Sequence, residues 1–394
     1  GDVCGRNGGT ITNCYWQSGT ADEADASAKT EDQFASGEVA WLLNQGQANG
    51  PWRQNLSSTD ADEYPVLGAA QSDTIVHKKE GEYENSGHYF DGNGFCTKPD
   101  CSACQPAAHD DGVYQISNAG QLYWFAEQVN SGEYDADAVM MTDITINTGV
   151  LGEDGSLNGD GSSFTQWTPI GNNRTNAYTG TFNGDGHTIS GLYYSGSSDY
   201  VGLFGYVGSN GRVQNVNVVD SYISNSHSNS CAGGVCGQND YGELTNCSFA
   251  GSVTGTYVGG VCGNNYSGTI TNCNNTGTVT GTGTDNRAYV GGVCGNNYSG
   301  TITNCYNTGT VTGTGNVGGV CGNNYSGTIT NCYWLSGKAD GDVGSNNGTV
   351  TNVKSKTAEE FASGEVAWLL NSNQANGPWR QNIGTDDYPV LNSN

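Results

Sequence analysis

The sequence has few basic residues, few methionines and prolines, and no long apolar run. Its 394 residues include 13 Lys and Arg, 2 Met and 7 Pro, against 39 Asp and Glu. The formal charge of -26 at pH 7 would repel nucleic-acid phosphates and anionic lipids, so we expect no nucleic-acid partner. No apolar segment reaches about 20 residues, so we also expect no membrane-spanning helix within this chain.

Glycine and cysteine are abundant instead. There are 62 Gly and 14 Cys, and most of the cysteines recur at fixed spacing. An even number of cysteines in a chain with little Met is typical of proteins that fold in an oxidising compartment. We therefore expect an extracellular protein that is secreted or attached to the cell surface.

One phrase, "GGVCGNNYSGTITNCYNTGTVTGTG", recurs in near copies along the second half of the chain. Its first cysteine returns after 26, 32 and 27 residues, a period typical of solenoids and propellers. Propeller blades need longer units of four strands, whereas alternation in each unit predicts about three. The sequence thus predicts an all-β fold, a right-handed parallel β-helix (β-solenoid), in which Asn264, Asn296 and Asn323 stack as a hydrogen-bonded ladder.

The repeated cysteines form pairs. In an earlier copy of the repeat, Phe204 and Val216 replace both members together, which indicates an inward-facing pair in a common core. We expect a disulfide within each repeat; free core thiols, or vertical bonds such as Cys262 to Cys294, are the alternatives. The spacing and the lack of neighbouring His disfavour metal binding. The expected pairs are Cys4–Cys14, Cys236–Cys247, Cys262–Cys273, Cys294–Cys305 and Cys321–Cys332.

The four other cysteines are Cys96, Cys101, Cys104 and Cys231. Three of them lie close to His88 in a Gly-rich stretch, which resembles a zinc site with three Cys and one His. In an exported chain, two further disulfides account for all four residues, and we favour that interpretation. We therefore expect no cofactor and no metal.

The units "VGGVCGNNYSGTITNCYNTGTVTG" resemble the GLUG-motif repeats of secreted bacterial surface proteins, and "VYQISNAGQLYWFAEQVNSG" and "YTGTFNGDGHTISGL" resemble the segments that precede such arrays. The resemblance covers most of residues 113–391. It implies a surface-exposed accessory region, found in adhesin-like proteins and beside the catalytic region of some peptidases, without catalytic residues of its own. The cysteine pairs depart from the usual aliphatic or small residues of the motif.

The chain contains nearly the same ending twice, since "FASGEVAWLLN" begins at Phe34 and again at Phe361. Each copy follows a capping box, Thr30 to Gln33 and Thr357 to Glu360, that predicts a short helix. A similar box, Asn118 to Gln121, predicts a helix at the other end of the array. We expect these helices to cap the solenoid ends.

The predicted domains are residues 1–67, the end of a preceding solenoid copy with its capping helix; 68–111, a linker and Cys-rich module; and 112–394, a solenoid with GLUG-like repeats and a C-terminal cap.

The duplication predicts a tandem parent protein. Residue 1 is Gly and no charged-then-apolar segment follows it, so we expect that an export signal was removed or lay upstream. The alignment places Gly1 in the middle of a repeat strand. Either the chain is a fragment, or a neighbouring copy supplies the missing strands and the subunits join head to tail into a stalk or filament.

Candidate chemistry is sparse. No repeated position carries the acid pair and the base that polysaccharide cleavage needs, and we interpret Asp185 and His187 as turn residues. Tyr266, Tyr298 and Tyr325 occupy equivalent turn positions and predict an exposed row on which sugar rings or a partner stack, although such residues can also simply cover the turns. We expect a non-enzymatic structural and adhesive module whose partners are host or matrix glycans or proteins. The alternatives are a glycan-binding module and a polysaccharide-cleaving enzyme.

Overall fold

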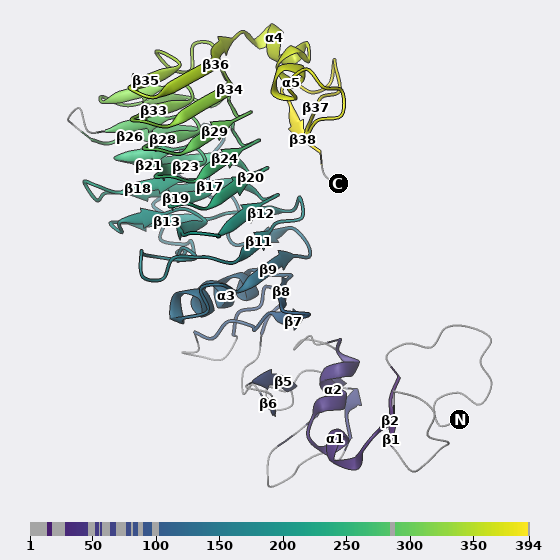
Figure 1. Ribbon diagram of the computed structural model, residues 1–394. Coiled ribbons are helices and arrows are strands. Elements are labelled where there is room, and N and C mark those ends of the chain that lie inside the picture. Colours follow the sequence, from purple (N-terminus) through teal and green to yellow (C-terminus); the bar gives the residue numbers. More distant parts are fainter. Residues whose placement is uncertain are drawn as a thin grey trace. The chain divides into compact units, whose positions relative to one another are not determined.

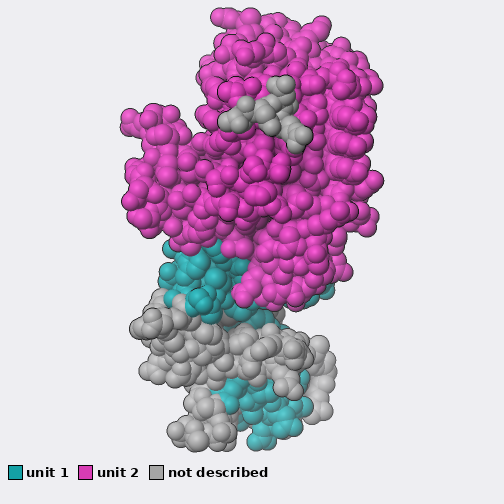
Figure 2. All heavy atoms as spheres, turned by 90° about the vertical axis from the view of Figure 1, so that its left-hand side faces the viewer, with its two compact units in different colours: residues 1–124 teal, residues 125–394 magenta. Residues whose placement is uncertain are grey.

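The computed structural model describes residues 14–17, 28–45, 52–54, 56, 64–67, 76–79, 82–85, 90–96, 102–283 and 288–392. The chain divides into two compact units, residues 1–124 and 125–394 (Figure 2). Within the described residues, no helix is both long enough and apolar enough to cross a bilayer.

The second unit is a β-solenoid, in which successive coils add parallel strands to the same sheets (Figure 1). The predicted all-β solenoid is therefore confirmed. One sheet consists of β14 (Tyr200–Val201), β18 (Cys231–Gly233), β22 (Tyr257–Gly259), β27 (Tyr289–Gly291) and β32 (Asn316–Gly318). A second consists of β15 (Phe204–Val207), β19 (Cys236–Asn239), β23 (Cys262–Asn265), β28 (Cys294–Asn297), β33 (Cys321–Asn324) and β35 (Val343–Asn346).

The remaining strands of the coils form two ladders that meet at a corner. The first ladder runs through β9 (Asp137–Met140), β11 (Thr181–Asn183), β16 (Arg212–Gln214), β20 (Glu243–Thr245), β24 (Thr269–Thr271), β29 (Thr301–Thr303), β34 (Thr328–Leu335) and β36 (Thr349–Lys356). The second contains β10 (Ile144–Thr145), β12 (Thr188–Ser190), β13 (Tyr193–Gly196), β17 (Asn217–Asn225), β21 (Ser248–Gly255), β25 (Asn274–Asn275), β26 (Thr278–Gly281), β30 (Tyr306–Asn307) and β31 (Val311–Thr312). A repeat thus contains more than the three predicted strands, because turns divide it into very short pieces.

The core is a stack of similar layers. Val213, Leu244, Ile270 and Ile302 pair in register along one ladder, and all four are fully buried. Each layer buries its apolar side chains only against the layers above and below, which is how a solenoid is stabilised without a globular core.

A helix covers the first coils of the stack. Helix α3 (Ala119–Ser131) has half of the predicted capping box: Asn118 Oδ1 accepts from Gln121 N at 2.9 Å, but Gln121 Oε1 accepts from Ser117 N and not from Asn118 N. Within the second unit, the α3 residue Phe125 packs against Phe182, with ring centroids 6.1 Å apart. The predicted cap at this end is confirmed.

The C-terminal segment contains α4 (Ala358–Ala362), α5 (Glu365–Leu370), β37 (Trp379–Arg380) and β38 (Val390–Leu391). Its capping box is present, with Thr357 Oγ1 accepting from Glu360 N at 3.2 Å. The segment does not cover the end of the stack as predicted. It lies beside the coils (Figure 1). There Phe361 and Trp379 pack in one buried cluster with Tyr306 and Tyr333. Those tyrosines follow inward cysteines, so they point outward and need an apolar cover.

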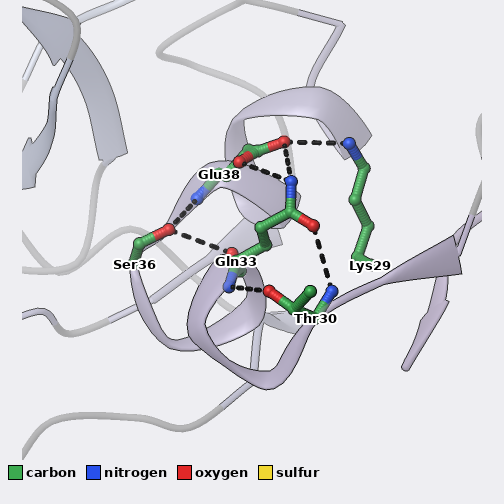
Figure 3. Close-up of polar contacts among 5 residues, drawn as sticks. All are labelled: Lys29, Thr30, Gln33, Ser36 and Glu38. Carbon is green, nitrogen blue, oxygen red and sulfur yellow. Dashed lines mark hydrogen bonds and ion pairs between the residues drawn. The ribbon is translucent and has the colours of Figure 1, made fainter. Parts of the chain in front are cut away.

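The first unit contains a second copy of this capped segment. The elements described in the first unit before α3 are β1 (Trp16–Gln17), β2 (Ala28–Lys29), α1 (Glu31–Ala35), α2 (Glu38–Leu43), β3 (Trp52–Arg53), β4 (Val66–Leu67), β5 (Val76–Lys79), β6 (Glu82–Asn85), β7 (Ala108–Asp110) and β8 (Val113–Ile116). Figure 3 shows Thr30 and Gln33 closing the capping box while Glu38 accepts from Lys29 Nζ at 2.8 Å. Lys356, Glu360 and Glu365 form the equivalent cluster in the C-terminal copy.

The predicted domain boundaries at residues 67 and 111 both fall within this first unit and stay a prediction.

Candidate functional site: side-chain ladders on the solenoid

The predicted tyrosine row is present at one corner of the solenoid. The rings of Tyr266 and Tyr298 stack with centroids 4.9 Å apart and planes 5° apart, and those of Tyr298 and Tyr325 stack at 4.8 Å and 9°. The three side chains are 37 to 50% exposed. Because the rings lie face to face, each covers the face of its neighbour, and the row presents ring edges and hydroxyl groups to solvent at a fixed spacing.

A fourth tyrosine extends this row and was missed by the sequence analysis. Tyr241 is 61% exposed, and its ring contacts that of Tyr266 edge to face at 6.3 Å. In the repeat alignment Asp240, not Tyr241, takes the place of Tyr266. Tyr241 adopts a left-handed backbone conformation, with φ of 64°. We call Tyr241, Tyr266, Tyr298 and Tyr325 the tyrosine row.

An internal asparagine ladder supports the tyrosine row. Asn265, Asn297 and Asn324 directly precede its three stacked members and are fully buried. Asn265 Nδ2 donates to Asn297 Oδ1, and Asn297 Nδ2 donates to Asn324 Oδ1, each at 3.0 Å. The same Nδ2 of Asn297 also donates to the carbonyl of Gly300. The amides thus hold each turn to the next coil and to itself, which fixes the spacing of the tyrosines.

The neighbouring ladder predicted from the sequence is confirmed. Asn296 Nδ2 donates to Asn264 Oδ1, and Asn323 Nδ2 donates to Asn296 Oδ1, both at 2.7 Å. Another corner uses asparagine differently: Asn215 and Asn246, at φ of 55°, adopt the left-handed conformation that turns the chain and bond to each other at 2.9 Å.

The cysteines of the repeats stack vertically and are free thiols, so the predicted disulfides within repeats are wrong for these pairs. Cys262 pairs in register with Cys236 below and Cys294 above, and the backbone N–H of Cys273 lies 3.4 Å from Cys305 Sγ. The members of a repeat lie on different ladders, so each thiol has its nearest cysteines in adjacent coils. The free, buried residues are Cys231, Cys236, Cys247, Cys262, Cys273, Cys294, Cys305, Cys321 and Cys332.

Burial favours the protonated form of most of these thiols. It raises the pKa of Cys262, Cys273, Cys294 and Cys305 well above the usual value, with smaller contributions from neighbouring thiols. Burial, together with the carboxylate of Asp199, raises the pKa of Cys231 to about 12. A neutral buried thiol is neither a nucleophile nor a good metal ligand, so these cysteines serve as small apolar core residues.

The remaining cysteines belong to the first unit. Cys96 is disulfide-bonded, as predicted for that residue, and Cys14 and Cys104 are half-buried. Cys4, Cys101 and His88 lie outside the described residues. In the part of the chain that the structure describes, no group of three or more His, Cys, Asp or Glu side chains is arranged to hold a metal ion.

Asp185 and His187 occupy a turn, as predicted. Asp185 is exposed with φ of 51°, and His187 Nδ1 lies 3.2 Å from Asp143 Oδ1, which also accepts from Thr188 N. The Asp143 carboxylate therefore supports the backbone of the turn.

Comparison with known proteins identifies the repeats. The model of the GLUG motif matches residues 228–254, 254–280 and 286–312. A "Putative Gly-rich membrane protein" of Evansella cellulosilytica is 37% identical over 21% of this chain, and "Halomucin" of Haloquadratum walsbyi is 36% identical over 26%. The matched parts span 9% and 1% of the lengths of these relatives.

A solved structure shares the fold. The crystal structure of a "putative immunoglobulin A1 protease" from Bacteroides ovatus superposes with a TM-score of 0.56, covers 73% of this chain and 94% of that chain, and is 21% identical. At this identity the likeness concerns the architecture alone. The chain is thus a β-solenoid that carries GLUG-motif repeats between residues 228 and 312.

Proposed function

We propose that this chain is a non-enzymatic structural and adhesive module of an extracellular tandem-repeat surface protein, and that the tyrosine row is its contact surface. The observation that carries the proposal is the stacked part of the row: Tyr266, Tyr298 and Tyr325 are parallel, exposed rings at coil spacing, backed by a buried amide ladder. Tyrosine is enriched at protein interfaces, because its ring supplies apolar contact area and its hydroxyl a hydrogen bond. Host or matrix glycans and proteins are the partners we expect.

The scaffold suits a load-bearing role. Each coil is joined to the next by strand pairing and by amide ladders that run through four successive coils, from Asn239 to Asn324. A relative described as a membrane protein and one described as a halomucin support a place at the cell exterior. The acidic composition suits a surface that must stay soluble.

Assembly into a stalk or filament is a further part of the proposal. The top coil ends in β35 and β36, which pair with β33 and β34 below. The C-terminal segment lies beside the coils, and most side chains of β36 are exposed. Such an edge is suited to pairing with a strand of another copy, head to tail.

Adhesion of coated beads tests the contact surface. Beads carrying the wild-type chain should bind cells or extracellular matrix, and a variant with Tyr266, Tyr298 and Tyr325 changed to Ser should lose most of that binding. The matched control changes Tyr257 and Tyr289 to Ser, because these rings also stack, 5.1 Å apart, but in the separate sheet that contains β22 and β27. Equal binding by both variants would contradict the role of the tyrosine row.

A further inference from the structure

A groove runs along the solenoid beside the C-terminal segment, within the second unit. It has a volume of about 580 Å³. One wall is made by the outward side chains of successive coils, and the other by residues 386–392. The second wall is fixed in place, since buried Tyr306 donates its hydroxyl to the carbonyl of Pro389 at 2.6 Å.

The first wall is a single outward row whose chemistry changes along the stack. Asn217, Ser248, Asn274 and Tyr306 follow one another in register, one per coil. Tyr306 faces the apolar core of the C-terminal segment, whereas the three polar residues line the open groove. With strands roughly 4.8 Å apart, these polar groups repeat at a spacing that suits a linear chain of sugar rings lying along the axis.

One residue in this row, Asn274, has a side-chain amide that can still form hydrogen bonds. Ser248 donates to Asn217 Oδ1 at 2.6 Å, and Asn217 donates to the carbonyl of Gly186, so both are already engaged. Asn274 is only 8% exposed and lines the groove, and its side-chain amide forms no hydrogen bond with the described residues. The Asn274 side-chain amide therefore opens into the groove, where a ligand or water can satisfy it.

The charge of the groove limits its ligand. Asp185 and Asp387 are exposed along its rim, and its described lining includes no Lys, Arg or His. Uronic or sulfated sugars would be repelled. The half-buried ring of Tyr388 supplies an aromatic surface beside the amides, a combination that suits the mixed polar and apolar faces of a sugar.

We infer that this groove binds a neutral linear oligosaccharide, with the Asn274 amide hydrogen-bonding its hydroxyl or acetamido groups. The inference deepens the proposed adhesive function and rests on it, but it assigns a site separate from the tyrosine row.

The test is an array of immobilised linear oligosaccharides of glucose, galactose, mannose and N-acetylglucosamine, with uronic-acid oligomers as the acidic counterparts. The full chain should bind a neutral member and no acidic one. Asn274→Ala should weaken that binding about tenfold, the effect of losing one or two hydrogen bonds. Ser299→Ala, at the corner of the tyrosine row, should bind like the wild type.

Two results would overturn the inference: no neutral oligosaccharide bound, or unchanged binding by Asn274→Ala. If Asn274→Ala unfolds, a second variant, Asp387→Lys, tests the groove, because it changes only an exposed carboxylate. This variant should bind acidic oligomers, and a failure to bind them would count against the groove site. Bead adhesion that depends on the tyrosine row but not on Asn274 would refute the groove site while leaving the proposed function standing.

Discussion

At the scale of residues, stability depends on polar side chains that satisfy one another inside the solenoid. Asn297 is the central example. Its fully buried amide accepts from Asn265 and donates to Asn324 and Gly300, so it links three coils. Such a network stabilises the fold only while every member has a partner.

Asn297→Ala should therefore be strongly destabilising. It leaves a buried donor on Asn265 and a buried acceptor on Asn324 unpaired, which should lower the free energy of unfolding by about 2 to 4 kcal/mol. Urea denaturation followed by circular dichroism measures this free energy of unfolding. Ser299→Ala, an exposed hydroxyl two residues away, is the control and should change it by less than about 0.5 kcal/mol. Similar effects for both variants would mean that the amide ladder contributes little.

The buried thiols predict a pH dependence. Burial raises the pKa of Cys262, Cys273, Cys294 and Cys305, so above about pH 8.5 the unfolded chain releases thiol protons that the folded chain keeps. The unfolded state then binds fewer protons, and stability falls as pH rises. Under reducing conditions, the thiols should leave the free energy of unfolding unchanged below about pH 8. At pH 9.5 the free energy of unfolding should fall, by up to about 1.4 kcal/mol per pH unit for each thiol.

Urea denaturation of the reduced chain at pH 7.5, 8.5 and 9.5 tests this prediction. A double variant, Cys294→Ala with Cys305→Ala, should show a shallower fall because two of the titrating groups are gone. A wild-type stability that stays flat to pH 9.5, or rises, would show that these thiols are not protonated in the folded core.

At the scale of elements, the short terminal helices depend on their capping boxes. In α4 the Thr357 hydroxyl accepts from Glu360 N, and the Glu360 carboxylate accepts from Thr357 N at 2.7 Å. Thr357→Ala should destabilise the C-terminal segment by about 1 kcal/mol, seen as faster hydrogen exchange of the α4 amides. Thr357→Ser keeps the hydroxyl and should exchange like the wild type; equal exchange by Ala and Ser would exclude a capping role.

Elements set by local chemistry could be predicted from the sequence, and those set by long-range packing could not. The capping boxes and the Asn264 ladder follow from spacing alone. The placement of the C-terminal segment does not, because it depends on Tyr306 and Tyr333 pointing outward from strands far away in the sequence. The disulfide prediction failed for a similar reason: Cys262 and Cys273 are close in sequence, but the fold places each thiol nearest to cysteines one coil away.

At the scale of the whole molecule, identical coils place the same side chain at the same position many times. Repetition builds a core from thiols and small aliphatic groups, and it presents a tyrosine row outside. The row was predicted from the sequence except for Tyr241. This tyrosine stands one residue after the position that Tyr266 occupies in its repeat, so the alignment of the repeats does not reveal it. The groove beside Asn274 could not be predicted, because the C-terminal segment forms its second wall.

The central claim is that this chain is displayed outside the cell, and immunogold electron microscopy of intact cells that make it tests this most directly. Antibodies raised against residues 125–394 should label the outer surface without permeabilisation, and the label should extend outward if copies join into a stalk. Label that appears only after the cells are permeabilised would contradict the account.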